Sequence, residues 1–214
     1  DRFTRAWRAE RISNRPPVLL LNGDAARPPL LWCCNNEKEF HAVVRNAPSD
    51  RPTVIIRSIH YVLGRTELRT RYYSDLAAAY LDAIKVHLGD LPSSIGASCG
   101  GNELMEELAH QVIASGGKAP HLILLEAEPS RPYPGHVTMF FGDASPVRNP
   151  FLTGSDPSEQ WQLDHVKVDW KIVAGDHDSM CWFEGADAVM QSIDQTMRST
   201  EAFDKSVVAT RVAR

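Results

Sequence analysis

The feature that most constrains the fold is the alternation along the chain of short apolar runs and longer amphipathic stretches. Seven apolar runs are predicted as strands: Val18–Leu21, Leu30–Cys34, Val54–Arg57, Ser94–Ala97, Leu122–Leu125, Val137–Phe141 and Val168–Val173. Four stretches are predicted as helices: Glu37–Asn46, Leu68–His87, Gly101–Ser115 and Gly185–Thr196. Apolar strands separated by amphipathic helices are typical of a mostly parallel sheet covered by helices on both faces. The sequence therefore predicts the α/β class.

Size and composition agree with one globular domain. The chain has 214 residues, 43% of them hydrophobic, and a net charge of −4, which suits a single domain with a sizeable core. We expect residues 1–16 to be an N-terminal linker and residues 17–214 to be the domain. The sequence shows no basic stretch of the kind that binds nucleic acid, and no apolar run of membrane-spanning length or signal peptide. We therefore expect a cytoplasmic protein with no nucleic-acid or membrane partner.

The four cysteines do not form a disulfide framework, because they are few and irregularly spaced: Cys33, Cys34, Cys99 and Cys181. Reduced thiols are the expectation for a chain without a secretory signal. Neighbouring residues on a strand point to opposite faces, so one of Cys33 and Cys34 is expected in the core.

A run of small residues, Ser98–Gly101, lies where the strand Ser94–Ala97 should give way to the helix Gly101–Ser115. A sharp strand-to-helix turn needs small neighbours, and it strains the backbone of the residue that it exposes. The start of the helix supplies N–H groups and a partial positive charge, which favour a thiolate and a developing oxyanion. This turn is therefore the candidate site of a nucleophile.

Two frames fit the G-x-S-x-G type of pattern at this turn. Gly96–Gly100 fits it directly and nominates Ser98, whereas a shift by one residue nominates Cys99. The short pattern alone leaves both residues open. The third interpretation is a buried structural cysteine at a helix start.

A longer comparison favours Cys99. The run Ile95-Gly96-Ala97-Ser98-Cys99-Gly100-Gly101, with Glu107-Leu108-Ala109 in the helix that follows, resembles the nucleophile elbow of thioesterase domains of nonribosomal peptide synthetases. These domains belong to the α/β-hydrolase superfamily, and their elbow runs Leu/Ile-Gly-Gly-x-Ser/Cys-x-Gly-Gly before a helix with Glu-hydrophobic-Ala. In that register Cys99 is the nucleophile and Ser98 the variable position. The resemblance implies an α/β-hydrolase fold and the cysteine variant linked to β-lactam or β-lactone formation.

Four more segments resemble the same family in the right order: Arg27–Asn35, Pro52–His60, His121–Glu126 and Gly175–Met180. The resemblance covers roughly residues 17 to 198. The last segment resembles the Gly-Asp-His-x-x-Met loop and implies His177 as the catalytic base. His60 follows a strand in an Arg-Ser-x-His segment, where it can edge the pocket.

The resemblance implies Glu126 as the acid that orients His177. The family carries Asp at this strand end, so the longer Glu must fold back to reach the imidazole. Asp143, at the end of the next predicted strand, is the alternative acid, because most other α/β-hydrolases place the acid there.

The resemblance also implies an oxyanion hole built from backbone N–H groups. One is that of Gly100, and the other is that of Asn36 or Glu37, after the strand Leu30–Cys34. The glycines of the family's His-Pro-x-Gly-Gly loop are absent here, and Asn35 and Asn36 can instead serve as helix caps. The ten residues Ala127–His136 are too few for the family's helical lid, so the lid is either vestigial or missing from the numbered chain.

Taken together, the resemblance implies an enzyme without a bound metal or cofactor. Its substrate is a peptidyl thioester on the phosphopantetheine of an upstream peptidyl carrier protein domain. Cys99 takes the chain and releases it, with intramolecular cyclisation to a β-lactam or β-lactone as the expected outcome. The alternatives are a free-standing cysteine-dependent acyltransferase between carrier proteins, a hydrolytic thioesterase, a serine esterase acting through Ser98, and a non-catalytic binding module.

Overall fold

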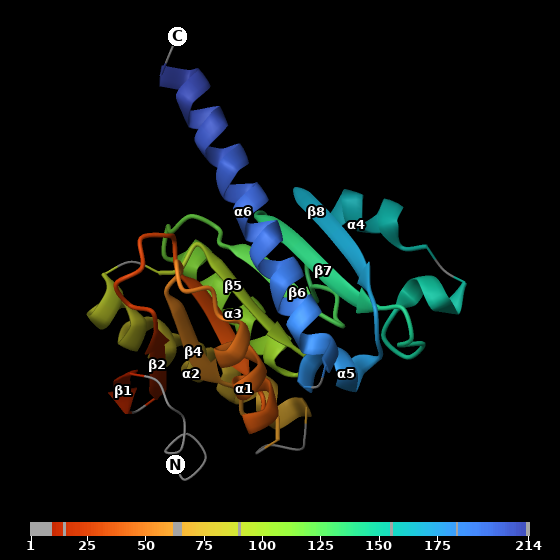
Figure 1. Ribbon diagram of the computed structural model, residues 1–214, viewed down its shortest axis with the longest axis horizontal. Helices are drawn as coiled ribbons and strands as arrows, with labels where there is room; N and C mark the ends of the chain where they lie inside the picture. The colour runs from red at the N-terminus through yellow and green to blue at the C-terminus, as the bar shows by residue number, and fades with distance from the viewer. Residues whose placement is uncertain are drawn as a thin grey trace.

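The computed structural model describes residues 10–14, 16–61, 66–89, 91–154, 156–182 and 184–212, which fold around one eight-stranded sheet (Figure 1). The strands are β1 (Glu10–Asn14), β2 (Pro17–Leu21), β3 (Leu30–Cys34), β4 (Thr53–Arg57), β5 (Ser94–Ser98), β6 (His121–Leu125), β7 (His136–Gly142) and β8 (Lys167–Val173). The helices are α1 (Glu37–Asn46), α2 (Thr66–Leu88), α3 (Gly101–Ala114), the 3₁₀ turn η1 (Pro150–Thr153), α4 (Ser158–Asp164), α5 (His177–Trp182) and α6 (Glu184–Val212).

The strand order β1-β2-β4-β3-β5-β6-β7-β8 places the two antiparallel strands at one edge of a sheet that is otherwise parallel. Strands β3 to β8 therefore all end at the same edge. Cys99 follows β5, Glu126 follows β6 and His177 follows β8 after a short loop. The topology by itself brings these three chain segments to one rim of the sheet.

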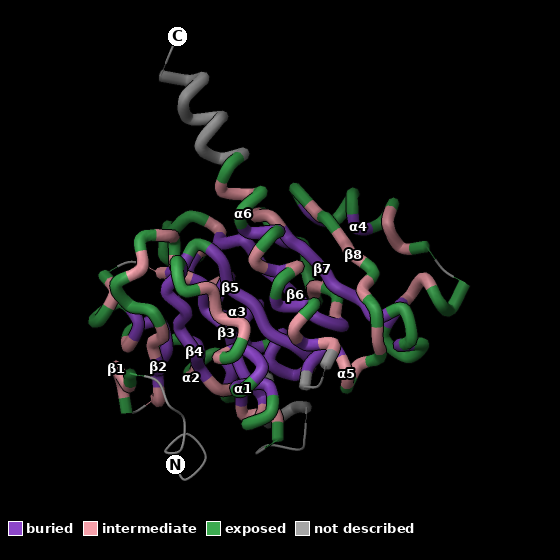
Figure 2. Tube along the Cα trace, in the orientation of Figure 1, coloured by how far each residue is buried: buried purple, intermediate pink, exposed green. Residues whose placement is uncertain are grey.

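Helices cover both faces of the sheet (Figure 1). One core cluster packs the sheet against α2, α3 and Trp161 of α4, and the other packs it against α1, α5 and α6. Figure 2 shows the central strands β3 to β7 as the buried centre between these layers, whereas the edge strands β1 and β8 are more exposed. Cys33 belongs to the first cluster and Cys34 to the second. Both thiols are buried, because each points to a face that helices cover.

The predicted fold class is confirmed, with eight mostly parallel strands and helices on both sides. All seven predicted strands and all four predicted helices are present, and α1 has the predicted bounds. The last helix, α6, is much longer than the predicted Gly185–Thr196. The short helices α4 and α5 were not predicted, since neither is long enough to show a helical period.

The segment expected to be a linker contributes a strand. Glu10–Asn14 form β1, which pairs antiparallel with β2, so the sheet begins before the boundary predicted at residue 16. Only Ile12 in this strand is a large apolar residue, and an edge strand with polar neighbours carries little hydrophobic signal. Residues 1–9, 15, 213 and 214 lie outside the described residues.

The connection between β6 and β7 is short and irregular. Residues 126–135, all of them described, contain no helix, as the length of this segment predicts. The Glu106 carboxylate on α3 accepts the Ser130 N–H at 2.6 Å and the Ser130 hydroxyl at 2.8 Å. This fastens the connection to the middle of α3 and leaves no helical cover from it over the rim where Cys99 lies.

Arg51 fastens α6 to the sheet. Its side chain is fully buried, and Nη1 donates to Glu201 of α6 at 2.5 Å and to the Pro28 carbonyl at 2.7 Å. Nε lies 3.4 Å from Asp194 of the same helix. Breaking a buried ion pair on one side leaves an uncompensated charge in the interior.

We expect Arg51→Ala to lower the free energy of unfolding by about 3–5 kcal/mol, the range for loss of one partner from a buried pair. Arg45→Ala is the matched control. Arg45 also pairs with an α6 carboxylate, that of Asp187, but both side chains are about half exposed, so its loss should change stability little. Urea unfolding followed by circular dichroism measures both variants. Equal effects would show that burial does not set the strength of the Arg51 contacts.

Candidate active site

Cys99 occupies a strained turn between β5 and α3. Its φ is +49°, in the left-handed region that residues with a side chain rarely adopt. The turn is closed by the Asn102 N–H, which donates to the Cys99 carbonyl at 3.1 Å. The Tyr73 hydroxyl donates to the Gly100 carbonyl at 3.0 Å. This is the geometry that the sequence predicts for a nucleophile elbow.

His177, the first residue of α5, faces Cys99 and Glu126. Its Nδ1 lies 3.6 Å from Oε2 of Glu126, within ion-pair distance when the imidazole is protonated. Hydrogen bonding to Cys99, and then the contact with Glu126, raise the pKa of His177 to about 9 against the effect of burial. The imidazole is therefore protonated at neutral pH when the thiol is ionised.

Glu126 is held in place by hydrogen bonds from groups other than His177. Its backbone also has a positive φ, +56°. Oε1 accepts the Gly142 N–H at 2.6 Å, and Oε2 accepts the Ser145 hydroxyl. Burial raises the pKa of this carboxyl, but the contacts with His177, Ser145 and the Gly142 N–H together bring the pKa below its ordinary value. A carboxylate therefore stands behind the imidazole.

Asp143, the alternative acid, is exposed and contacts the loop before His177. Its carboxylate accepts the Gly175 N–H at 2.9 Å. Since Gly175 has a φ of +118°, this bond fixes the turn that delivers His177. The structure thus places Glu126 beside the imidazole and Asp143 on the loop backbone. The catalytic role of either residue stays a prediction.

The environment of Cys99 favours the thiolate. Partial burial raises the pKa of the thiol, but hydrogen bonds from His177 and the Gly100 N–H, and the positive charges of His177 and Arg148, outweigh burial. The net pKa lies below the ordinary thiol value. Burial raises the pKa of the other three thiols, those of Cys33, Cys34 and Cys181.

Ser98, the rival nucleophile, points into the interior. The residue is 1% exposed. Its hydroxyl donates to Oε1 of Glu39 at 2.8 Å and accepts from Nδ2 of Asn35 at 3.1 Å. Its proton is therefore directed to a buried carboxylate, and the hydroxyl lies beneath the turn that presents Cys99.

A buried network around Glu39 joins the candidate oxyanion loop to this turn. The Glu39 carboxylate accepts the Asn35 N–H at 2.8 Å and the Trp32 indole N–H at 3.3 Å. Asn35 Nδ2 donates to the Ser98 carbonyl at 2.8 Å, and Ser58 donates to Asn35 Oδ1 at 2.7 Å. Burial raises the pKa of Glu39 to about 7 in spite of these bonds. The sequence signal for Glu39 was its place on the apolar side of α1.

The two remaining oxyanion candidates begin α1. Asn36 is the N-cap, and its side chain accepts the Glu39 N–H at 3.0 Å, while Glu37 is the first helical residue. The first N–H groups of a helix lack partners within the helix. Because Asn35 is bonded to Ser98, this helix start is held at the same rim as Gly100. Asn36 is thus a helix cap, and the backbone donors at Asn36 and Glu37 stay predictions.

His60, which the sequence predicts at the edge of the pocket, is a second imidazole beside Cys99. Its Nε2 lies 3.8 Å from Sγ of Cys99, within hydrogen-bond reach for sulfur. The sequence signal was its place directly after β4.

The described residues hold no group of three or more His, Cys, Asp or Glu side chains placed to bind a metal ion. Within the same part of the chain, no helix has the length and apolar character that a membrane crossing requires.

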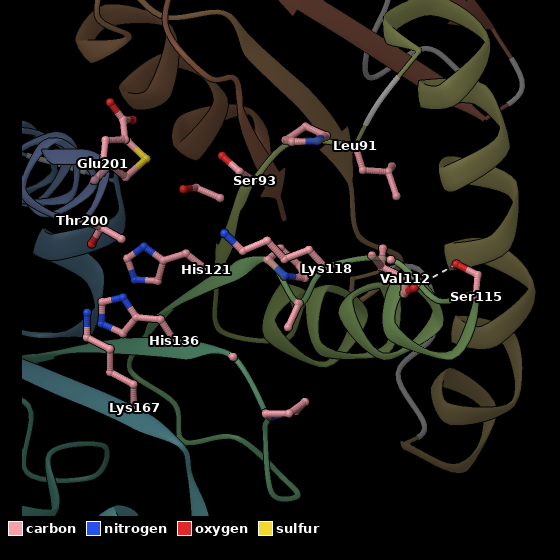
Figure 3. Close-up of a pocket in the computed structure, with 18 of the residues that line it drawn as sticks. Leu91, Ser93, Val112, Ser115, Lys118, His121, His136, Lys167, Thr200 and Glu201 are labelled. Atoms are coloured by element: carbon pink, nitrogen blue, oxygen red, sulfur yellow. Dashed lines mark hydrogen bonds between the residues drawn. The ribbon is translucent and has the colours of Figure 1, made fainter. Parts of the chain in front are cut away.

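A cavity of about 980 Å³ lies at the opposite rim, where the parallel strands begin (Figure 3). The rings of His121 and His136 stack there at 4.0 Å, beside Lys118 and Lys167. Burial lowers the pKa of His121 to about 3. This cavity is separate from Cys99.

Comparison with known proteins identifies the fold. No family model and no curated protein matches the sequence. The NocB thioesterase domain in covalent complex with a fluorophosphonate nocardicin G analogue matches with a TM-score of 0.63 and 15% identity, over 84% of this chain and 99% of that one. The chain therefore shares the α/β-hydrolase fold of that domain.

Two further solved structures match with similar TM-scores and similarly low sequence identity. AB3403, a four-domain nonribosomal peptide synthetase, gives a TM-score of 0.61 at 13% identity, over 84% of this chain and 20% of that one. YbtT, a type II thioesterase of the yersiniabactin pathway, gives a TM-score of 0.59 at 11% identity, over 82% of this chain and 96% of that one. At these identities the likeness establishes the fold.

We expect Cys99 to react with iodoacetamide at a lower pH than an ordinary thiol, because its pKa is lowered. His177→Ala removes the largest stabilising contact and should move the pH profile of alkylation upward. The buried thiols should stay unmodified in the folded protein, which peptide mass mapping checks. An unchanged profile in His177→Ala would show that the imidazole does not activate the thiol.

We expect Glu126→Gln to reduce thioester turnover by about 100-fold or more, as loss of the orienting acid does in comparable triads. Asp143→Asn is the matched control, since it keeps the shape of a carboxylate that contacts only loop backbone in the described structure. Steady-state release of free thiol measures both. A larger loss in Asp143→Asn would assign the acid to β7 instead of β6.

Proposed function

We propose that this chain is a thioesterase domain whose Cys99 takes an acyl chain from carrier-bound phosphopantetheine and releases it. The observation that carries the proposal is a thiol at positive φ that hydrogen-bonds to His177, which in turn lies against the buried Glu126 carboxylate. The likeness in fold to thioesterase domains supports it. The implied partner is an upstream peptidyl carrier protein domain, and the chemistry needs no metal or bound cofactor.

In the first step the Cys99 thiolate attacks the thioester carbonyl. The Gly100 N–H, with a first-turn N–H of α1, stabilises the oxyanion of the tetrahedral intermediate. As the intermediate collapses, the bond to the pantetheine sulfur breaks, and the His177 imidazolium gives its proton to that sulfur. Glu126 stays ionised and holds the imidazole in the productive tautomer.

In the second step a nucleophile releases the chain from Cys99, and neutral His177 accepts a proton from it. An acyl-cysteine is still a thioester, so more driving force remains than in a serine ester. This favours a poor nucleophile or a strained product, and we propose intramolecular closure to a β-lactam or β-lactone as the outcome.

Transfer to an acceptor on another molecule is the second candidate. The observation that favours it is the short β6–β7 connection, in which the described residues 126–135 form no helix. A rim without that cover admits a second carrier protein as well as water, so acyl transfer and hydrolysis compete with ring closure.

Intact mass spectrometry after incubation with acetyl-pantetheine tests the nucleophile. We expect Cys99→Ala to lose the acetyl adduct completely. Ser98→Ala should keep it, because the Ser98 hydroxyl is bonded to Glu39 beneath the turn. Some loss of stability in Ser98→Ala is expected, since Glu39 and Asn35 lose a buried partner.

Two results would contradict this expectation, and each leads to a different conclusion. An adduct that persists in Cys99→Ala and disappears in Ser98→Ala would make the protein a serine enzyme. No adduct on the folded wild-type protein with any activated acyl-pantetheine would reject the thioesterase proposal in favour of a binding module.

A further inference from the structure

Two histidines approach Cys99 from opposite directions along the sheet. His177 follows β8, three strands from β5 on one side, and His60 follows β4, two strands from β5 on the other. His177 is the residue paired with the acid. His60 directs Nε2 at the same sulfur, 3.8 Å away.

The orientation of His60 is fixed by packing. Its ring lies so close to the elbow that a Cβ on Gly100 would come within 2.0 Å of Nδ1. Its backbone N–H lies 3.3 Å from the Ser58 hydroxyl oxygen, which in turn donates to buried Asn35. The Tyr61 ring meets it edge-on at 5.1 Å. The imidazole is therefore held against the reacting atom and is not a loosely placed surface group.

Proton counting indicates what a second imidazole can do. When the pantetheine sulfur has left with the proton of His177, the acyl-enzyme contains neutral His177. A water or hydroxyl that attacks the acyl carbonyl loses one proton, and His177 can accept it. An aliphatic amine arrives at neutral pH as an ammonium ion and must lose two protons to become an amide nitrogen.

We propose that His60 is a second catalytic base that accepts one of these two protons, and that the acceptor for the acyl chain is an amine. His60 takes one proton from the ammonium, the nitrogen–carbon bond forms, and the carbon–Sγ bond breaks. His177 takes the other proton, Cys99 leaves as a thiolate, and His60 passes its proton to water. This rests on the proposed thioesterase function and selects, within it, an amine over a hydroxyl or water.

Several titratable groups surround His60. Cys99 and Tyr61 contact the ring, Tyr73 of α2 bonds to Gly100 beneath it, and His177 and Arg148 act on Cys99 from the other side. Once Cys99 is acylated its negative charge is gone. In the proposed step the His60 imidazole, 3.8 Å from the acylated sulfur, acts as a base at the acyl group.

The test follows the fate of Cys99 acylated with acetyl-pantetheine and supplied with a chosen amine. Ethylamine is almost entirely an ammonium ion at neutral pH, whereas trifluoroethylamine is mostly neutral and has only one proton to lose. We expect His60→Gln to lower the ratio of N-ethylacetamide to acetate by about 100-fold, a typical contribution of a positioned base. The corresponding ratio for trifluoroethylamine should change little.

His41→Gln, an exposed histidine on α1, is the matched control and should leave both ratios as in wild type. Raising the pH until ethylamine is neutral should restore the ratio in His60→Gln. In His60→Ala, added imidazole should restore the ratio of N-ethylacetamide to acetate at neutral pH. Such a rescue would show that the loss in His60→Gln comes from the missing base and not from a packing defect.

Equal loss with both amines and with water, or no rescue by pH and imidazole, would overturn the role of His60 while acylation still supports the thioesterase. Failure of folded wild-type protein to form the acetyl adduct would reject the proposed function and, with it, this inference.

Discussion

The site depends on the buried hydrogen bonds of Asn35 and Glu39. A left-handed Cys99 is unfavourable by itself and persists only where its neighbours over-determine it. Here the residue before it, Ser98, is bonded through its hydroxyl to Glu39 and through its carbonyl to Asn35. The same two side chains tie the end of β3 to the start of α1. Where the family resemblance implies a glycine-rich loop, this chain has a buried polar network, whose hydrogen bonds are shielded from water and correspondingly strong.

Sequence reasoning succeeded where periodicity and local turn chemistry decide structure. The strands and long helices followed from apolar spacing, and the turn at Ser98–Gly101 followed from its small residues. The choice of Cys99 within that turn came from the family resemblance. The family resemblance implied Glu126 as the acid. The structure places it 3.6 Å from His177, because both lie at the rim where parallel strands end, and its catalytic role stays a prediction. β1 was wrongly assigned to a linker, because a polar edge strand has no apolar alternation to reveal it.

The buried polar network could not be foreseen in the same way. Glu39 lies on a helix face that otherwise buries Phe40 and Val43. The apolar periodicity of a helix does not predict a buried carboxylate at such a position. The partner of Glu39 on β5, Ser98, is 59 residues away in sequence, and Ser58, which joins the network through Asn35, is 23 residues from Asn35. Likewise His60 meets Cys99 only because β4 and β5 flank β3 in the folded sheet. Contacts of this kind depend on tertiary geometry, and one chain's local spacing does not encode them visibly.

The short connection between β6 and β7 has a consequence for kinetics. Under the proposed function, an acyl group on Cys99 is not enclosed by a helix from that segment, so its lifetime is set by competition between water and the acceptor. In such a competition the local concentration of the acceptor matters more than its intrinsic reactivity. A nucleophile carried on the acyl chain itself, or on a partner held at the rim, gains an effective concentration that a freely diffusing competitor cannot match. Tethering of the nucleophile, and not its enclosure with the acyl group beneath a lid, would then control which product forms.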